Sequence, residues 1–211
     1  MIISGIDETG KGAVFGDMIV ALATSKYSLE ETNSLLLRLG VRDSKLLSRI
    51  KRKEIIKVLD RDPNIKIEII SIPSSTIDRY VFSQKLNELL FEKNVELINK
   101  LPESQGICYI DAFIRPFLLE TRLASLAKNN LIPPTTFIIE HKADLKYPIV
   151  GLASIYAKEY REDLLDATGL RESIGSGYPS DEKVKNYIRN NFKSYCNKTL
   201  KSIRYSWKLK L

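Results

Sequence analysis

Two adjacent carboxylates near the start of the chain are the first residues whose types could do chemistry. Asp7 and Glu8 end a short apolar run, and the turn Gly10-Lys11-Gly12 follows at once. Neighbouring carboxylates repel each other unless a cation holds them, and a glycine turn that carries a lysine suits a phosphate. This order of residues therefore indicates a site where metal ions meet a nucleic-acid backbone.

Two other interpretations account for part of this stretch. As plain structure, the two acids would be solvated residues leaving a strand, and the glycines would only form the turn. The run from Gly5 to Lys11 also fits the G-x-x-x-x-G-K pattern of a nucleotide-binding loop. That pattern fails at Gly12, where a Ser or Thr hydroxyl would hold magnesium, and residues 17–24 resemble a strand instead of the required helix.

Further acids lie at strand ends later in the chain. Asp111 ends the apolar run 107–111, which suits a strand buried on both faces of a parallel sheet. Ligands gather at the carboxyl ends of parallel strands, so we expect Asp7 and Asp111 to lie at one edge. A fourth acid is ambiguous: Glu140 ends a strand, and Asp144 lies at the entrance to the following helix. Position alone favours Glu140.

Several carboxylates at one site suit Mg²⁺ or Mn²⁺, because these ions prefer oxygen ligands. Two such ions about 4 Å apart can activate a water and stabilise the leaving oxygen when a phosphodiester is cleaved. Adjacent strand residues point to opposite faces. We therefore expect Glu8 to join Asp7 only because the chain turns at Gly10.

The elements that must position these acids follow from periodicity and turn signals. Three early strands with short connections favour an antiparallel meander, and the later strand–helix–strand unit favours parallel pairing through a right-handed crossover. The pattern predicts an α/β fold with a mixed five-stranded sheet and helices on both faces. We expect strands in the opening run and at 17–24, 65–72, 107–111 and 136–140, and helices at 28–39, 48–59, 83–101, 115–127, 149–165 and 182–192.

Composition restricts the class of protein. The chain has 211 residues and is 44% apolar, but no run approaches the ~20 apolar residues of a membrane helix. The first residues lack a signal-peptide pattern, so we expect a cytoplasmic protein. We also expect a monomer without a membrane partner. The formal charge is +7, and residues 192–211 hold six basic residues and no acid. Such a tail is either a solvated face or a contact for a polyanion, and both interpretations stay open.

Beyond these patterns, the chain resembles a known family, type 2 ribonuclease H (ribonuclease HII). Residues 5–12 (GIDETGKG) resemble its GIDEAGRG signature, and Tyr109-Ile110-Asp111 resembles its central strand acid. Further similar blocks keep their order across nearly the whole chain: 41–45 (V-x-DSK), 141–158 (HKAD-x-x-YP … ASI-x-AK), the archaeal-type 175–181 (GSGYPSD), and Arg204-x-Ser206-Trp207.

The resemblance implies a ribonuclease H-like catalytic domain over residues 1–172, with a basic, mostly helical C-terminal extension, 173–211, packed on it. It also implies metal-dependent endonucleolytic cleavage of RNA in RNA/DNA hybrids and of single ribonucleotides embedded in duplex DNA. Cleavage would fall 5′ to the ribonucleotide, use two Mg²⁺ or Mn²⁺ ions, and leave a 3′-hydroxyl and a 5′-phosphate. The alternatives are a non-catalytic hybrid-binding protein of the same fold and a related exonuclease.

The resemblance also assigns residues. It gives the four metal-binding catalytic acids as Asp7, Glu8, Asp111 and Asp144, which overrules Glu140. It implies that Gly10, Lys11, Gly12 and Tyr178 sense the ribonucleotide–deoxyribonucleotide junction and that Ser44 and Lys45 bind a phosphate. Apart from the resemblance, Ser154 and Lys158 are four residues apart and so share one helix face, where they either contact the nucleic acid or are simply exposed.

Some residues depart from the family pattern or keep a structural interpretation. Lys11 stands where the signature has Arg, which keeps the charge and loses the bidentate fork. Asp17 replaces a Pro and adds negative charge near the site. We expect the single histidine, His141, to be structural, and Trp207 to pack the tail onto the domain.

Overall fold

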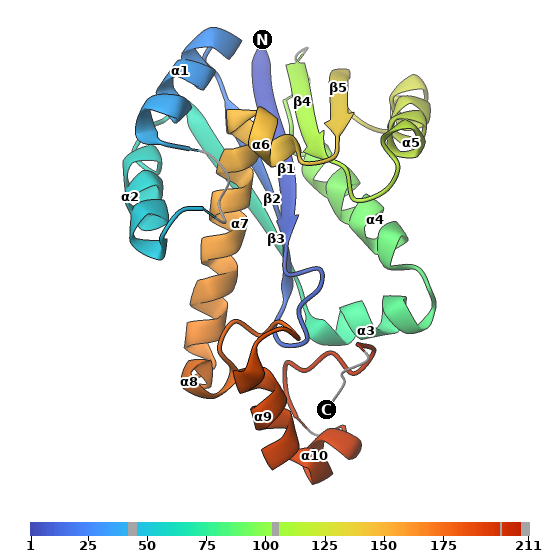
Figure 1. The fold of residues 1–211 in the computed structure, drawn as a ribbon. Helices are drawn as coiled ribbons and strands as arrows, with labels where there is room; N and C mark the ends of the chain where they lie inside the picture. The colour runs from blue at the N-terminus through green and yellow to red at the C-terminus, as the bar shows by residue number, and fades with distance from the viewer. Residues whose placement is uncertain (42–45, 103–105, 199, 208–211) are drawn as a thin grey trace.

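The computed structural model of the chain describes residues 1–41, 46–102, 106–198 and 200–207. Its centre is a five-stranded sheet in the order β3-β2-β1-β4-β5 (Figure 1). The first three strands pair antiparallel, whereas β1, β4 and β5 run parallel. These pairings confirm the predicted mixed sheet. The strands are β1 Ile2–Thr9, β2 Met18–Ser25, β3 Ile65–Ile72, β4 Gly106–Asp111 and β5 Thr135–Glu140.

Helices cover both faces of this sheet (Figure 1). One face carries α7, which is backed by α1 and α2, and the opposite face carries α4 and α5, with α3 at its end. The helices of these two layers are α1 Leu29–Leu39, α2 Arg49–Leu59, α3 Ser74–Phe82, α4 Leu86–Ile98, α5 Pro116–Lys128, α6 Ala143–Lys146 and α7 Pro148–Ala167.

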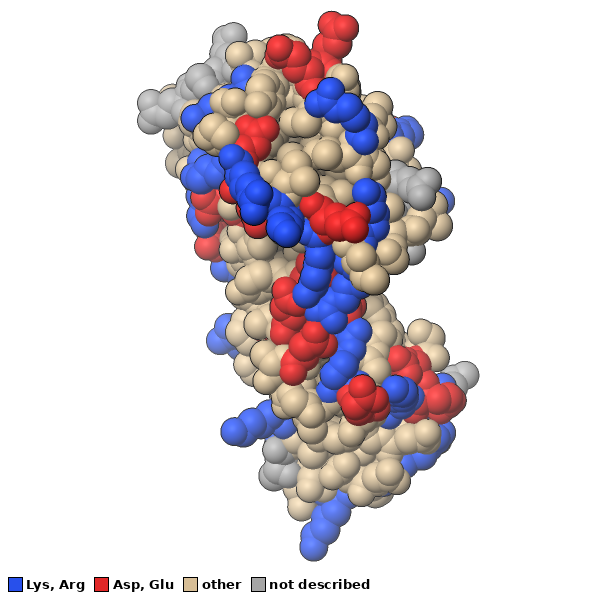
Figure 2. Space-filling model, turned by 90° about the vertical axis from the view of Figure 1, so that its left-hand side faces the viewer, with Lys and Arg blue, Asp and Glu red and all other residues tan. Residues whose placement is uncertain are grey.

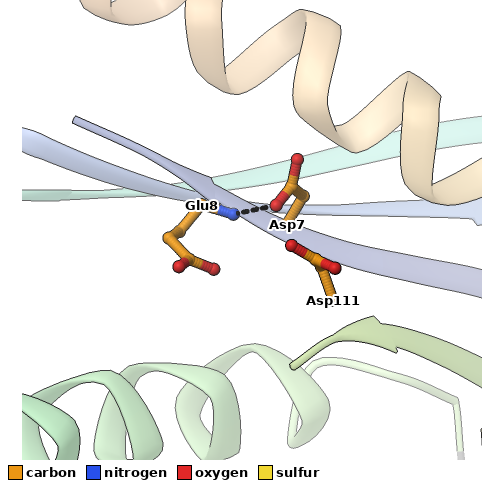
Figure 3. A group of neighbouring side chains, drawn as sticks. All are labelled: Asp7, Glu8 and Asp111. Atoms are coloured by element: carbon orange, nitrogen blue, oxygen red, sulfur yellow. Dashed lines mark hydrogen bonds between the residues drawn. The ribbon is translucent and has the colours of Figure 1, made fainter. Parts of the chain in front are cut away.

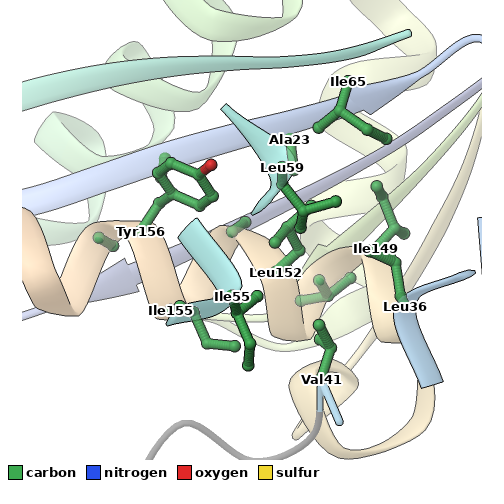
Figure 4. Packing of buried hydrophobic residues seen from close by; sticks show 14 of the residues in the cluster. Ala23, Leu36, Val41, Ile55, Leu59, Ile65, Ile149, Leu152, Ile155 and Tyr156 are labelled. Carbon is green, nitrogen blue, oxygen red and sulfur yellow. The ribbon is translucent and has the colours of Figure 1, made fainter. Parts of the chain in front are cut away.

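Strand β2 shows how the sequence separates the two layers. All eight of its residues are buried, as expected of a strand with a helical layer on each face. Because side chains alternate along a strand, Ile19 packs with the α7 cluster and Val20 with the α4 cluster. Figure 4 shows the first cluster, where Leu36 and Ile55 from α1 and α2 meet Leu152 from α7.

Helix α7 is enclosed on nearly every side in its first half. From Ile149 to Ala157 each of its residues is buried, and the first charged residue is Lys158. A helix that is apolar all round belongs inside a fold, and α7 lies between the sheet and the α1–α2 pair. This helix is therefore a rigid support for the side chains that it turns toward β1.

Capping interactions mark the ends of α1 and the start of α2. Ser28 Oγ accepts a hydrogen bond from the Glu31 N–H, and the Glu31 carboxylate accepts one from the Ser28 N–H, which is a complete capping box. Gly40 ends α1 in the left-handed conformation, and Ser48 caps α2. The strand predicted at 65–72 has those bounds in the structure.

The helix predicted at 83–101 is confirmed over 86–98 only, and the helix before it, at 74–82, was not predicted. The structure has α3 at Ser74–Phe82, a break, and then α4 at Leu86–Ile98. Gln84 takes a left-handed conformation at the break (φ 58°), and the N–H of Lys85 donates to the Tyr80 carbonyl at 2.7 Å. Sequence periodicity missed this turn because no glycine or proline marks it. The helix predicted at 182–192 is confirmed as α9 Glu182–Asn190, and a short helix that was not predicted, α10 Phe192–Cys196, follows it.

The C-terminal segment packs on the loop after β1. Besides α9 and α10 it contains the short α8 Arg171–Ile174, and its apolar residues form a cluster with Val14 and Phe15. Phe15 also pairs with Ile203 in an isolated antiparallel bridge. Trp207 packs against this cluster and against the α4 side of the core, as predicted. The division at residue 172 stays a prediction. Among the described residues, no helix is long and apolar enough to cross a membrane.

Candidate metal centre and substrate pocket

Two of the four predicted acids meet because β1 and β4 are parallel neighbours. In the register that pairs Ile6 with Ile110, the next residues along the two strands are Asp7 and Asp111. The carboxyl ends of both strands therefore present an acid at the same edge of the sheet. Asp7 is buried (6% exposed), and Asp111 is half-buried.

Glu8 joins this pair from the other side of β1. One ligand oxygen from each of Asp7, Glu8 and Asp111 lies within 4.8 Å of the others, and Figure 3 shows the three carboxylates grouped around the strand. The reason expected from the sequence, a turn at Gly10, is wrong, because β1 continues through Thr9 and Glu8 still pairs with β2. The β1–β4 pairing ends at Ile6 and Ile110, so Glu8 lies beyond the paired part of that edge.

Helix α7 supports Asp7 from above the sheet. Gly5 allows this approach, since a Cβ atom there would lie 2.7 Å from the backbone of Ile149 and Val150. The close packing brings Ser154 to Asp7, and the Ser154 hydroxyl donates a hydrogen bond that favours the ionised carboxylate. Ser154 is itself buried.

The fourth acid reaches the site from helix α6. Asp144 is buried and lies close enough to Asp7 and Glu8 to raise the pKa of both. Asp111 accepts a hydrogen bond from the Ala143 N–H at 2.8 Å, which fixes the helix start against β4. Glu140, favoured by position alone, is engaged elsewhere: it accepts the Tyr147 hydroxyl at 2.6 Å and forms an ion pair with Lys146.

The electrostatics of this group fit a divalent cation. Burial and then repulsion by Glu8 raise the pKa of Asp7 well above its usual value. The pKa of Glu8 is likewise raised to about 7, chiefly by burial and then by the repulsion of Asp111, against the attraction of Lys11. Carboxylates in such a position are unfavourable when ionised, and a bound cation removes that penalty. The donors are all carboxylate oxygens, which suit Mg²⁺ or Mn²⁺.

A pocket of about 410 Å³ opens over these acids. It gathers seven of the predicted site residues, including Tyr178 from the C-terminal segment, together with Thr9 from β1. Its lining is Asp7, Glu8, Thr9, Asp111, Asp144, Ser154, Lys158 and Tyr178.

The glycine turn lies next to this pocket and contacts Tyr178. The N–H of Gly10 donates to the Tyr178 hydroxyl at 3.2 Å, so residues 168 positions apart form one surface. Lys11 extends to the loop after β4, where its Nζ donates to the Phe113 carbonyl at 3.3 Å. Gly12 is exposed and has open space where a side chain would be. Ser44 and Lys45, predicted at a phosphate, lie outside the described residues.

The basic helix α2 is not a free cationic surface. Figure 2 shows blue and red side chains alternating along this side of the molecule. Arg52 of α2 pairs with the buried Glu159 of α7 at 2.5 Å. Arg49 bonds the same acid at 3.2 Å and Asp163 at 2.7 Å. These pairs join α2 to α7, so the arginines there have a structural role.

Two buried arginines near the glycine turn were missed by the sequence analysis. Arg204 is 0% exposed although it belongs to the basic tail, and Arg161 of α7 is 3% exposed. The Arg161 guanidinium lies 4.9 Å from the centre of the Tyr178 ring. Only the similarity of Arg204-x-Ser206-Trp207 to a family block pointed to one of them, and it gave no role.

Comparison with known proteins decides the family. The family model described as ribonuclease HII matches residues 4–210. The chain belongs to the ribonuclease HII family. A ribonuclease HII of Pyrococcus furiosus is 35% identical over 210 residues, covering 98% of this chain and 88% of that protein. Family membership makes this protein a metal-dependent endoribonuclease of the ribonuclease H type.

Solved structures support the same assignment. The ribonuclease HII of Archaeoglobus fulgidus, solved in a complex with PCNA, matches with a TM-score of 0.81 at 31% identity, over 100% of this chain and 97% of that one. The ribonuclease H2 of Pyrococcus horikoshii matches with a TM-score of 0.81 at 32% identity, over 99% and 94%. The ribonuclease H-like fold implied by the sequence resemblance is therefore confirmed.

Proposed function

We propose that this ribonuclease HII homologue cleaves RNA in RNA/DNA hybrids and single ribonucleotides embedded in duplex DNA. Cleavage falls on the 5′ side of the ribonucleotide and leaves a 3′-hydroxyl and a 5′-phosphate. The observation that carries the proposal is the convergence of Asp7, Glu8 and Asp111 from two strands, with ligand oxygens within 4.8 Å of one another.

Four carboxylates hold the metal ions in this proposal. Asp7, Glu8 and Asp111 surround the end of β1, and Asp144 adds a fourth carboxylate from α6. These carboxylates would hold two Mg²⁺ or Mn²⁺ ions, which would supply Lewis-acid activation of the attacking water and charge stabilisation of the leaving oxygen. The protein keeps the acids in place by burial, by the Ser154 hydroxyl at Asp7 and by the Ala143 N–H at Asp111.

The glycine turn and Tyr178 recognise the ribonucleotide. The bond between the Gly10 N–H and the Tyr178 hydroxyl joins the two parts of this surface beside the acids. Gly12 has no side chain and open space around it, so a substrate backbone can approach closely. The 2′-hydroxyl is the group that distinguishes RNA from DNA at such a contact. Lys158, in the lining of the pocket, supplies a positive charge for a phosphate.

The deciding experiment uses a DNA duplex with one internal ribonucleotide. With Mg²⁺ or Mn²⁺ we expect a single cut 5′ to the ribonucleotide, and the upstream product should be extended by a DNA polymerase because it ends in a 3′-hydroxyl. An all-DNA duplex and a sample with chelator are the controls. Binding without any cut in Mn²⁺ would support the hybrid-binding alternative, and stepwise shortening from an end would support the exonuclease.

A further inference from the structure

A buried arginine from the far end of the chain contacts the glycine turn directly. The Arg204 Nη1 donates to the carbonyl of Gly10 at 2.6 Å and to the carbonyl of Lys11 at 3.2 Å. Its Nε donates to the carbonyl of Gly16 at 2.9 Å. One guanidinium therefore holds both ends of the loop between β1 and β2.

These bonds determine where the N–H groups of the turn point. In a trans peptide the C=O and the N–H of the same unit point in opposite directions. The carbonyls of Gly10 and Lys11 face Arg204, so the N–H groups of Lys11 and Gly12 face away from it. Gly12 is exposed, with open space where a Cβ atom would lie. Two successive N–H groups directed outward form a concave surface suited to an oxygen acceptor.

We propose that Arg204 is a positioning residue for ribonucleotide recognition, because it holds the glycine turn with its N–H groups directed at the substrate. The inference rests on the proposed function, since it assigns the device that shapes the recognition surface of that site. Arg204 does not touch the substrate in this arrangement. It acts through the carbonyls of Gly10 and Lys11.

A second buried arginine holds the other half of the same surface. Arg161 Nη2 donates to the carbonyls of Phe15 at 3.0 Å and Ser176 at 3.1 Å, and its guanidinium lies against the Tyr178 ring. Gly10 lies directly on Arg161, because a Cβ atom there would be 2.8 Å from the Arg161 Nε. The two arginines thus support the glycine turn and Tyr178. These two parts are joined by the hydrogen bond from the Gly10 N–H to the Tyr178 hydroxyl.

This arrangement is electrostatically costly, which argues against a purely packing role. Burial and then the positive charge of Arg161 together lower the pKa of Arg204 to about 10. The acids that offset this charge are Asp17, whose carboxylate accepts the Ser71 hydroxyl, and Asp78. Two buried like charges are unfavourable unless the hydrogen bonds and counter-charges around them offset the cost. Asp17 therefore balances the arginines, which explains why an acid is tolerated at that position.

The C-terminal segment is anchored on both sides of Arg204. The Arg204 N–H donates to the Val14 carbonyl at 2.8 Å. On the other side, the Asp78 carboxylate of α3 accepts the N–H groups of Tyr205 at 2.9 Å and Ser206 at 3.0 Å. The guanidinium therefore reaches the turn from a fixed backbone, and the end of the chain becomes part of the recognition apparatus.

The test measures discrimination directly, by binding in chelator to a duplex with one ribonucleotide and to the matching all-DNA duplex. We expect Arg204→Met to lower the ratio of the two affinities by about tenfold or more, because the turn loses a charged donor. Affinity for all-DNA should change less than about twofold. Arg204→Lys keeps the charge but loses the two-pronged guanidinium group, so its affinity ratio should lie between those of the wild type and Arg204→Met.

The matched control is Tyr205→Phe, which removes the hydroxyl bond to Leu200 in the same segment and leaves Arg204 in place. It should keep the wild-type ratio. A folded Arg204 variant with the wild-type ratio overturns the inference, as does an equal loss of affinity for both duplexes. If Arg204→Met does not fold, Arg204→Lys decides, and if neither folds the role is structural and the inference fails. A wild-type protein that neither discriminates nor cuts would instead refute the proposed function.

Discussion

Asp111 accepts a hydrogen bond from the backbone N–H of Ala143 at 2.8 Å, and this bond ties the end of β4 to the start of α6. Asp144, the next residue, lies in the pocket lining. Lys142 adopts a left-handed conformation (φ 59°) just before the helix, so the chain turns sharply after β5. The acid on the helix therefore reaches the pocket, whereas Glu140 at the strand end is held by Lys146 and Tyr147.

The first prediction separates these two acids. Asp144→Asn should lower cutting of the one-ribonucleotide duplex by more than about 100-fold, because even the outer partners of metal ligands typically account for about 10–100-fold. Glu140→Gln removes a carboxylate of the same kind at the position paired with Asp111 and should change cutting by less than about threefold. Single-turnover rates at saturating Mg²⁺ check both, and the reverse order of effects would move the fourth ligand to Glu140.

The second prediction concerns stability without metal. Asp7 is destabilising when ionised, because it is buried beside Glu8, Asp111 and Asp144. Asp7→Asn should therefore raise the Tm in chelator by a few degrees, since about 1 kcal/mol corresponds to roughly 2–4 °C in a protein of this size. The same variant should lose most of the Tm increase that Mn²⁺ gives the wild-type protein. A thermal melt with and without Mn²⁺ tests both parts, and a lower Tm in chelator would contradict the electrostatic argument.

The third prediction concerns how the stability of the metal-free protein depends on pH through Glu8. The pKa of Glu8 is raised from 4.5 to about 7 in the folded state, so the folded protein binds a proton more tightly than the unfolded chain. The stability linked to this proton is present below about pH 4.5 and is lost as the pH rises through about 7. In chelator the Tm of wild-type protein should fall over this window relative to Glu8→Gln. Parallel Tm profiles for the two proteins would contradict it.

The fourth prediction concerns Ser154. The sequence placed Ser154 and Lys158 on one helix face as substrate contacts, but the structure engages the Ser154 hydroxyl with Asp7. Ser154→Ala should raise the Mg²⁺ concentration needed for half-maximal cutting by about 10–100-fold, the range for partners of metal ligands. The KM for the duplex at saturating Mg²⁺ should change much less. A larger effect on the duplex KM than on the Mg²⁺ requirement would return Ser154 to the substrate.

The strands, and the acids Asp7 and Asp111 at the ends of two of them, were predictable because short stretches of sequence mark them. The apolar runs before Asp7 and Asp111 define two buried strands, and parallel pairing puts their ends together. The α3–α4 break was not predictable, because the left-handed Gln84 leaves no mark in the hydrophobic pattern.

The missed parts of the site depend on contacts between distant residues. Arg204 reads as one more cation in a basic tail, yet it is buried on a turn 194 residues earlier in the chain. The choice of Asp144 over Glu140 depends on the turn at Lys142 and on the ion pair at Lys146, neither of which periodicity reveals. The assignment of Asp144 as the fourth acid came from the family resemblance and stays a prediction.

The fifth prediction compares two glycines in the same signature. A Cβ atom at Gly5 would lie 2.7 Å from the backbone of α7, so Gly5→Ala must push the helix from β1 and should cost about 1–3 kcal/mol or more. Gly12 has no atom within 4 Å of its Cβ position, so Gly12→Ala should keep the wild-type Tm or raise it slightly. Denaturant unfolding measures both changes.

Activity then separates the two positions further. Gly12→Ala should lower kcat/KM for the one-ribonucleotide duplex by about tenfold or more despite an intact fold, because the added methyl group occupies the space that the substrate backbone approaches. Gly5→Ala should lose activity in proportion to its loss of folded protein and of the Ser154 contact with Asp7. If Gly12→Ala cuts as the wild type does, the exposed glycine is only part of the turn, and substrate recognition must lie with Tyr178 and its neighbours.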